Sequence, residues 1–168
     1  MIAKFKNSGL VWLWLTVVFI IVDQLTKQYI VANFDLYERT AVLSFFNLTY
    51  AQNPGAAFSF LADQPGWQRW FFSIIAAVAS VVFLVWMAKT PRDNKLLSIA
   101  FALLLSGAIG NLIDRLLFGY VIDFLDFYYQ QYHWPAFNAA DSVIFIGAAL
   151  MIFDSFKKEP ETSNHSTE

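Results

Sequence analysis

Residues 96–117 read LLSIAFALLLSGAIGNLIDRLL, a run in which the only charged residues, Asp114 and Arg115, stand near the end. A helix of about 20 mainly apolar residues is long enough to cross a lipid bilayer. Three other stretches have the same character, at about 10–34, 70–88 and 134–153. The sequence therefore predicts an all-α membrane protein with four transmembrane helices.

The composition of the whole chain also favours a membrane environment. Of its 168 residues, 58% are hydrophobic and 14% are charged, whereas about a quarter of the residues in an average soluble domain are charged. A net charge of -2 offers no basic face to a nucleic acid, so we expect no nucleic-acid partner. The chain has no cysteine, which excludes a disulfide, a thiolate metal site and a cysteine nucleophile.

The N-terminal segment has features of a secretory signal peptide, because Lys4 and Lys6 precede an apolar run over 10–22. No small-x-small cleavage site follows, so we interpret this run as part of an uncleaved first span. We expect residues 1–158 to form a single membrane domain. The polar residues 159–168 are expected to form a short disordered tail in the cytoplasm.

The placement of lysine and arginine predicts the orientation, because positively charged loops stay in the cytoplasm. Basic residues precede the first span, separate the second from the third and follow the fourth: Lys4, Lys6, Lys89, Arg92, Lys95, Lys157 and Lys158. Both termini are therefore expected in the cytoplasm. The loops at about 35–69 and 118–133 then lie on the outer side.

The first outer loop predicts a small β element. Large apolar residues alternate with small or polar ones over 46–51, and Asn53-Pro54-Gly55 supplies turn chemistry. We expect a cradle-like sheet between the first and second helices, on the outer membrane face. The second outer segment, over 118–137, is rich in the aromatic residues that are typical of headgroup depth.

Polar residues inside the spans each need a partner or a function, because an ionisable residue at the bilayer centre costs about 2.5–3.5 kcal/mol. Asp23 and Lys27 stand four apart with the acid first, the favourable order for a helical ion pair. Both a neutralising pair and a role near an active site remain open for them. Asn111 shares a helical face with Asp114 and Arg115, which predicts a polar network in the third span.

Small residues over 106–110 in the third span permit close approach of another helix. At the start of the fourth span, Asn138 and Asp141 stand three apart, as in a helix N-terminal cap. The alternative is that Asp141 faces Asp123 across the outer surface. Two nearby carboxylates do not readily both ionise, so such a pair holds a proton and can activate water against an amide carbonyl.

Other functions have less support in the sequence. His133 and His165 are the only histidines, and neither makes a convincing base for Ser142 in a Ser-His-Asp triad. Zinc sites need several His or Cys ligands, so we expect no metal and no cofactor. A proton-coupled transporter or channel is an alternative for a protein with intramembrane acids, although these acids gather on one side of the membrane. A noncatalytic assembly factor is a second alternative.

Five sequence blocks occur in order along the chain. They are Asp23-Gln24-Leu25-Thr26-Lys27, Asn53-Pro54-Gly55-Ala56-Ala57-Phe58, Gly107-Ala108-Ile109-Gly110-Asn111-Leu112-Ile113-Asp114-Arg115, Val121-Ile122-Asp123-Phe124 and Phe137-Asn138-Ala139-Ala140-Asp141. Together they resemble the bacterial lipoprotein signal peptidase family, also called signal peptidase II, over nearly the whole chain. The departures are Ser106, where a second glycine is expected, and Pro54.

The resemblance implies an aspartyl endopeptidase of the bacterial inner membrane, acting toward the outer face. It implies cleavage of diacylglyceryl-modified prolipoproteins just before the lipidated cysteine, with membrane lipid as the other partner, by a monomer. Matching blocks give Asp123 and Asp141 the catalytic positions, and Asp114 and Asp126 are the competing acids, Asp114 being expected to be structural. The remaining site positions that the resemblance implies are Asn53, Gly55, Asn111, Arg115, Asn138, Asp23 and Lys27.

Overall fold

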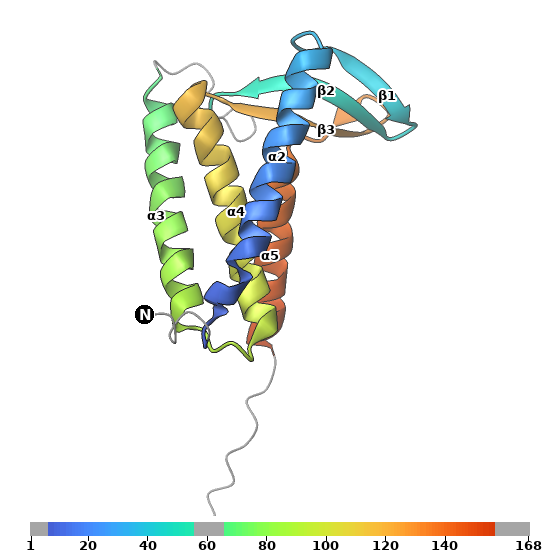
Figure 1. Cartoon of the computed structure of the whole chain (residues 1–168). Helices are drawn as coiled ribbons and strands as arrows, with labels where there is room; N and C mark the ends of the chain where they lie inside the picture. The colour runs from blue at the N-terminus through green and yellow to red at the C-terminus, as the bar shows by residue number, and fades with distance from the viewer. Residues whose placement is uncertain (1–6, 56–65, 157–168) are drawn as a thin grey trace, which may run out of the picture.

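The computed structural model describes residues 7–55 and 66–156. Within them, a bundle of helices carries a small sheet at one end (Figure 1). The helical segments are η1 (Gly9–Trp12), α2 (Leu13–Asn33), α3 (Trp67–Lys89), α4 (Lys95–Leu117) and α5 (Ala139–Ser155). The strands are β1 (Arg39–Leu43), β2 (Phe46–Asn53), β3 (Val121–Tyr129) and β4 (Tyr132–His133). Several features of the sequence interpretation lie outside the described residues: Lys4, Lys6, Lys157, Lys158, residues 56–58 and the tail at 159–168.

Three helical segments are long and apolar enough to cross a membrane: Gly9–Asn33, Trp67–Lys89 and Lys95–Leu117. The helix α5 has 17 residues, which corresponds to about 25 Å, and it runs beside α4 (Figure 1). Three apolar helices of spanning length are therefore confirmed, and the fourth crossing remains a prediction. The fourth helix begins at Ala139 rather than near 134, because Asn138 caps it.

The helix α4 forms the centre of the bundle and packs against α2, α3 and α5. It is buried along most of its length, whereas the outward faces of its neighbours expose large apolar side chains. Leu25 is 60% exposed, Ile74 is 62% exposed and Phe145 is 77% exposed. Helices with apolar outer faces have no favourable contact with water, so the bundle surface is suited to lipid.

Two glycines explain how closely the helices approach α4. A Cβ atom at Gly107 would overlap the carbonyl oxygen of Ala140 and the side chain of Ile144 in α5. A Cβ atom at Gly110 would lie 2.6 Å from Oδ2 of Asp23 in α2. The small residues predicted to allow close helix packing therefore do so on two sides of α4.

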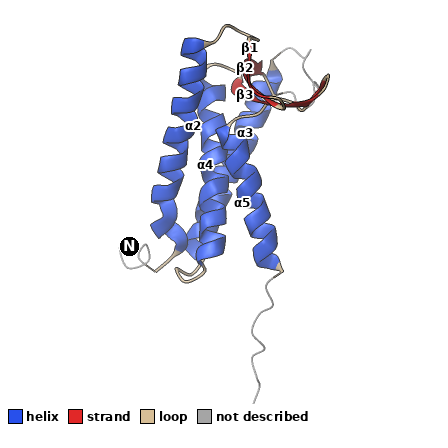
Figure 2. Cartoon of the chain, turned by 90° about the vertical axis from the view of Figure 1, so that its right-hand side faces the viewer, coloured by secondary structure: helices blue, strands red, loops and turns tan. Residues whose placement is uncertain are grey.

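The sheet is antiparallel with strand order β1-β2-β3-β4, and Figure 2 shows β1, β2 and β3 nearly edge-on above the bundle. The prediction of a β element between the first two helices was incomplete, because β3 and β4 come from the connection between α4 and α5. That connection was interpreted as an aromatic boundary segment. Its long strand instead pairs with β2, which places Asp123 beside Ala51.

Candidate active site

Asp123 lies on β3, where the sheet meets the helix bundle, and is only 3% exposed. Asn53, at the end of β2, donates from Nδ2 to Oδ2 of Asp123 over 3.0 Å. The Oδ1 atom of Asn53 accepts the backbone N–H of Gly55 at 2.9 Å. Gly55 has a φ of 115°, a left-handed conformation that favours glycine, and a Cβ there would lie 2.6 Å from Phe72. The turn thus orients the Asn53 amide toward Asp123.

Asp141 lies in the first turn of α5 and is half-buried. It forms a reciprocal capping box with Asn138. The backbone N–H of Asp141 donates to Oδ1 of Asn138 at 2.9 Å, and the backbone N–H of Asn138 donates to Oδ2 of Asp141 at 3.3 Å. Asn111 of α4 donates from Nδ2 to the other carboxylate oxygen of Asp141 at 2.7 Å.

One amide group connects the two acids. The Nδ2 atom of Asn138 donates to Oδ1 of Asp123 at 2.7 Å, while its Oδ1 atom accepts from the backbone of Asp141. The same Nδ2 atom also lies 3.2 Å from Oδ1 of Asn111. The structure therefore brings Asp123, Asp141, Asn111 and Asn138 into one hydrogen-bonded group, with Asn53 on its sheet side.

A second group of charges lies beside the first. Lys27 is 1% exposed, and its Nζ atom lies 2.9 Å from Asp23, 2.9 Å from Asp114 and 3.0 Å from Oδ1 of Asn111. An ammonium group has three N–H donors, so these three acceptors match its capacity. Asp23 also accepts the backbone N–H of Ala140 at 2.9 Å. Asp23 and Lys27 form the expected ion pair, and Asp114 shares the same cation.

Gln24 is a site-supporting residue that the sequence reasoning missed. Its Nε2 atom donates to Oδ1 of Asp114 at 2.9 Å and reaches Oδ2 of Asp23 at 3.2 Å and the carbonyl oxygen of Gly110 at 3.3 Å. Its position between Asp23 and Lys27 in the same sequence block was the available signal. Gln24 thus joins the two acids that share Lys27.

Arg115 follows Asp114 on α4 but points elsewhere. Its Nη1 atom donates to the carbonyl oxygen of Asn111 at 3.2 Å, and its guanidinium lies 5.5 Å from the centre of the Phe72 ring. Among the described residues, the buried Nε atom of Arg115 has no hydrogen-bond partner. The guanidinium therefore keeps donor capacity close to Asp141, with which it shares a cavity.

The pKa of Asp123 is raised to about 7. Burial is the largest cause, because it disfavours the charged carboxylate, and the nearby charge of Asp141 raises the pKa further. Hydrogen bonds from Asn53 and Asn138 and the charge of Lys27 act in the opposite direction. Asp123 therefore retains a proton at a pH where ordinary aspartates have lost it.

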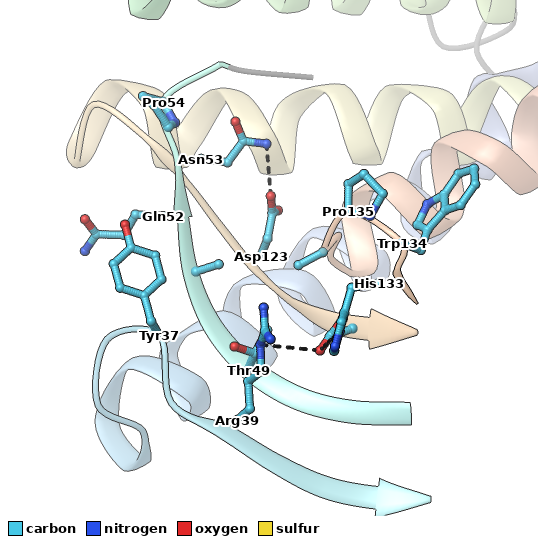
Figure 3. Close-up of a pocket in the computed structure, with 13 residues that line it drawn as sticks. Tyr37, Arg39, Thr49, Gln52, Asn53, Pro54, Asp123, His133, Trp134 and Pro135 are labelled. Carbon is cyan, nitrogen blue, oxygen red and sulfur yellow. Dashed lines mark hydrogen bonds and ion pairs between the residues drawn. The ribbon is translucent and has the colours of Figure 1, made fainter. Parts of the chain in front are cut away.

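Asp123 and Asp141 line two different cavities. The first, which we call the sheet cavity, has a volume of about 400 Å³ and is lined by Asp123 and by residues of the sheet (Figure 3). The second, which we call the helix cavity, has a volume of about 320 Å³ and lies among α3, α4 and α5. It is lined by Asn111, Arg115 and Asp141 together with apolar side chains.

Asp126, the competing acid on β3, has other partners. It is 2% exposed, accepts from Nδ2 of Asn47 at 2.9 Å and lies 2.8 Å from Nδ1 of His133. Within residues 7–55 and 66–156, no group of three or more His, Asp or Glu side chains lies close enough to hold a metal ion.

Known structures identify the class of protein. Two solved bacterial membrane enzymes, determined by the in meso method at 2.3 and 1.9 Å resolution, share this fold. The first is 35% identical with a TM-score of 0.74, covering 87% of this chain and 90% of that chain. The second is 34% identical with a TM-score of 0.75, covering 86% and 91%. The fold is thus that of bacterial membrane enzymes.

Sequence comparison identifies the family. The family model described as signal peptidase (SPase) II matches residues 15–157. The lipoprotein signal peptidase of Alteromonas mediterranea is 54% identical over 99% of this chain and 91% of its own length. That of Shewanella amazonensis is 55% identical over 92% of each chain. The chain belongs to the signal peptidase II family and is a protease, which favours hydrolysis over transport.

Proposed function

We propose that this protein is an aspartyl endopeptidase that removes signal peptides from diacylglyceryl-modified prolipoproteins. It cuts just before the lipidated cysteine, with water activated by Asp123 and Asp141. The observation that carries this proposal is the bridge formed by Asn138. Its side-chain amide bonds the carboxyl group of Asp123 and its backbone N–H bonds that of Asp141, without placing a cation between them. In the described part of the chain, neither acid forms an ion pair, whereas Asp23 and Asp114 share Lys27.

One aspartate acts as the general acid and the other as the general base. Asp123 holds the proton, in agreement with its raised pKa. Asp141 accepts two hydrogen bonds at a helix N-terminus, an environment that suits a carboxylate. Asp141 takes a proton from water as the water oxygen attacks the amide carbonyl carbon, and Asp123 protonates the carbonyl oxygen.

The resulting gem-diol then breaks down. Asp141 returns its proton to the amide nitrogen as the C–N bond breaks, and a hydroxyl of the gem-diol returns a proton to Asp123. One water is consumed, and a carboxylic acid and an amine are formed, with both aspartates restored. Asn53, Asn111 and Asn138 position the carboxyl groups, and Gly55 positions Asn53. Arg115 has free donor capacity for a substrate carbonyl oxygen beside Asp141.

The helix cavity suits the lipid-embedded part of the substrate. Its apolar lining comes from helices whose other faces are suited to lipid, and it ends at Asn111, Arg115 and Asp141. A diacylglyceryl chain is worth about 0.8 kcal/mol per buried methylene, so the substrate cannot leave the membrane cheaply. A protease for this substrate must therefore work at lipid depth and still admit water.

We infer that the protein lies in the bacterial inner membrane as a monomer, that α5 is the fourth span, and that the site faces the outer side. The start of α2, the end of α5 and the connection that carries Lys89, Arg92 and Lys95 lie at the end of the bundle opposite the sheet (Figure 1). The positive-inside tendency places that end, and hence both termini, in the cytoplasm. The sheet and the two acids then lie outside.

A defined substrate tests the proposal. Purified protein is incubated with a diacylglyceryl-modified precursor peptide, and the products are measured by mass spectrometry for the wild type, Asp123→Asn and Asp141→Asn. We expect cleavage before the modified cysteine by the wild type, and loss of at least about 1,000-fold in kcat/KM for each variant. Equal thermal melting temperatures would show that the variants fold. Full cleavage by either folded variant would exclude the two-aspartate mechanism.

A further inference from the structure

Asp126 holds all four strands of the sheet through side-chain contacts. Its carboxylate accepts from Asn47 of β2 at 2.9 Å and contacts Nδ1 of His133 of β4 at 2.8 and 3.0 Å. Nε of Arg39, on β1, lies 3.6 Å from the same carboxylate. The ring of His133 is fixed further by stacking on Tyr128, with ring centres 5.2 Å apart. This cluster shares no residue with the group around Asn138.

The cluster nevertheless faces the cavity that contains Asp123. Residues three apart on a regular strand point to opposite faces, yet Asp123 and Asp126 both line the sheet cavity. The backbone N–H groups of Phe124 and Leu125 both donate to the carbonyl oxygen of Phe137, at 2.9 and 2.8 Å. Two successive N–H donors on one carbonyl oxygen indicate a β-bulge-like irregularity between the two acids. This irregularity brings the side chains of Asp123 and Asp126 to the same side of the strand.

Arg39 is the exposed cation of this cavity. Its side chain is 57% exposed, and its one ion pair uses Nε at a long distance from a carboxylate that Asn47 and His133 already satisfy. Among the described residues, the two terminal nitrogens of Arg39 have no hydrogen-bond partner. Figure 3 shows Arg39 and His133 on the side of Asp123 away from Asn53. The two terminal nitrogens of the guanidinium can therefore make a bidentate contact with a group bound in the cavity.

We propose that Arg39 determines specificity by binding a carboxylate side chain of the mature part of the substrate. This inference rests on the function proposed above: if the signal segment occupies the helix cavity beside Asp141, the chain beyond the scissile bond enters the sheet cavity. Asp126, which contacts Arg39, stands three residues after Asp123 on β3, and three residues of strand span about 10 Å. With the scissile bond at Asp123, Arg39 therefore lies near the third substrate residue after the bond. Asp126, Asn47 and His133 are positioning residues, which fix the guanidinium at that distance.

The expected preference is modest, because Arg39 is more than half exposed and solvent weakens its attraction. A two-pronged Arg–carboxylate contact in a cavity is stronger than a contact on an open surface. We expect kcat/KM to be about threefold to tenfold higher for an acidic residue than for its neutral amide counterpart. The preference should shrink in high salt, as it does for partly exposed charges.

The test uses three lipidated peptides that differ only at the third residue after the scissile bond, which is Asp, Asn or Lys. Cleavage is measured in micelles of an uncharged detergent without phospholipid, so that no lipid phosphate supplies the anion. The wild type should prefer Asp over Asn over Lys. Arg39→Gln should cleave all three about equally, and Arg39→Glu should prefer Lys. Lys95→Gln, at the opposite end of the bundle, is the matched loss of a cation and should keep the wild-type order.

The positioning role of Asp126 has its own readout. Asp126→Asn should reduce the preference for the Asp peptide while cleavage of the Asn peptide is retained, whereas a merely structural residue would lower all three rates together. Equal rates on the three peptides in the wild type, or a uniform loss in Arg39→Gln, would overturn the proposed subsite and leave the protease mechanism intact. Failure of the two-aspartate mechanism would appear instead as full cleavage by Asp123→Asn.

Discussion

Two pairs of aspartates lie side by side at the end of the bundle that carries the sheet, and their negative charges are balanced by different groups. Asp23 and Asp114 share the ammonium of Lys27, with both N···O distances at 2.9 Å. Asn138 instead bonds both Asp123 and Asp141, through its side-chain amide to the carboxylate of Asp123 and through its backbone N–H to the carboxylate of Asp141. A buried acid with a cation partner is held as a charge, whereas a pair held by amides can retain a proton. The difference separates acids that join the helices through a cation from the acids that we propose exchange protons with a substrate.

The two pairs are connected through Asn111. Lys27 donates to Oδ1 of Asn111 at 3.0 Å, so the side-chain Nδ2 of Asn111 must face the other way, where it donates to Asp141 at 2.7 Å. The ammonium thus fixes the orientation of an amide that in turn fixes one acid of the proposed pair. Lys27 and its two acids thus act on Asp141 through Asn111.

The largest expected effect comes from removing the shared cation. Lys27→Met leaves two buried carboxylates without compensation, which costs about 3–5 kcal/mol of unfolding free energy. Thermal unfolding in detergent, followed by tryptophan fluorescence, measures this loss as a large decrease in the melting temperature. Lys89→Met, at the other end of the bundle, is the matched control and should unfold near the wild-type temperature. An unchanged melting temperature for Lys27→Met would mean that Asp23 and Asp114 do not depend on the cation.

The pH dependence of activity gives the next effect. If Asp123 must carry a proton, kcat/KM should fall about tenfold per pH unit above its pKa of about 7. This is measured with a lipidated peptide between about pH 6 and 9 in a detergent in which the protein stays folded. Activity that is constant up to pH 9 would contradict the assignment of the acid to Asp123.

Stability should follow the same group in a predictable direction. The folded pKa of about 7 exceeds the ordinary value of 3.8, so the folded protein binds this proton more tightly than the unfolded chain does. The contribution of Asp123 is therefore complete below about pH 4 and is lost as the pH rises through about 7. The melting temperature of the wild type should fall over that window relative to Asp123→Asn, which has no such group to titrate.

The sequence predicted what depends on local periodicity. A four-residue spacing on one helix was enough to predict the Asp23–Lys27 ion pair, and the small residues around Gly107 and Gly110 predicted close helix packing. The polar network of Asn111 and Asp114 followed from a shared helical face. These features need no knowledge of how distant segments pair.

The features that were missed depend on distant segments or on irregular backbone. The strand β3 was not predicted, because its residues do not alternate between apolar and polar and its partner β2 lies far away in sequence. The common face of Asp123 and Asp126 depends on two amides that share the carbonyl of Phe137. Asn47 lies directly opposite Asp126 in the pairing of β2 with β3, so the cluster around Asp126 depends on the pairing of distant strands, which no local pattern encodes.

The smallest expected change in stability separates the two tasks of Asn138. Serine is about as good as asparagine at a helix N-cap, so Asn138→Ser should keep the cap of α5 and lower the unfolding free energy by less than Asn138→Ala does. Serine has no amide to donate to Asp123, so the bridge at 2.7 Å is lost. We expect kcat/KM to fall by up to about 100-fold, because small displacements of reacting groups are costly.

Asn138→Ala should lose both functions and about 1 kcal/mol of stability. If serine and alanine reduced melting temperature and activity in parallel, Asn138 would act through the cap alone, and the difference between cation-held and amide-held acids would not explain catalysis.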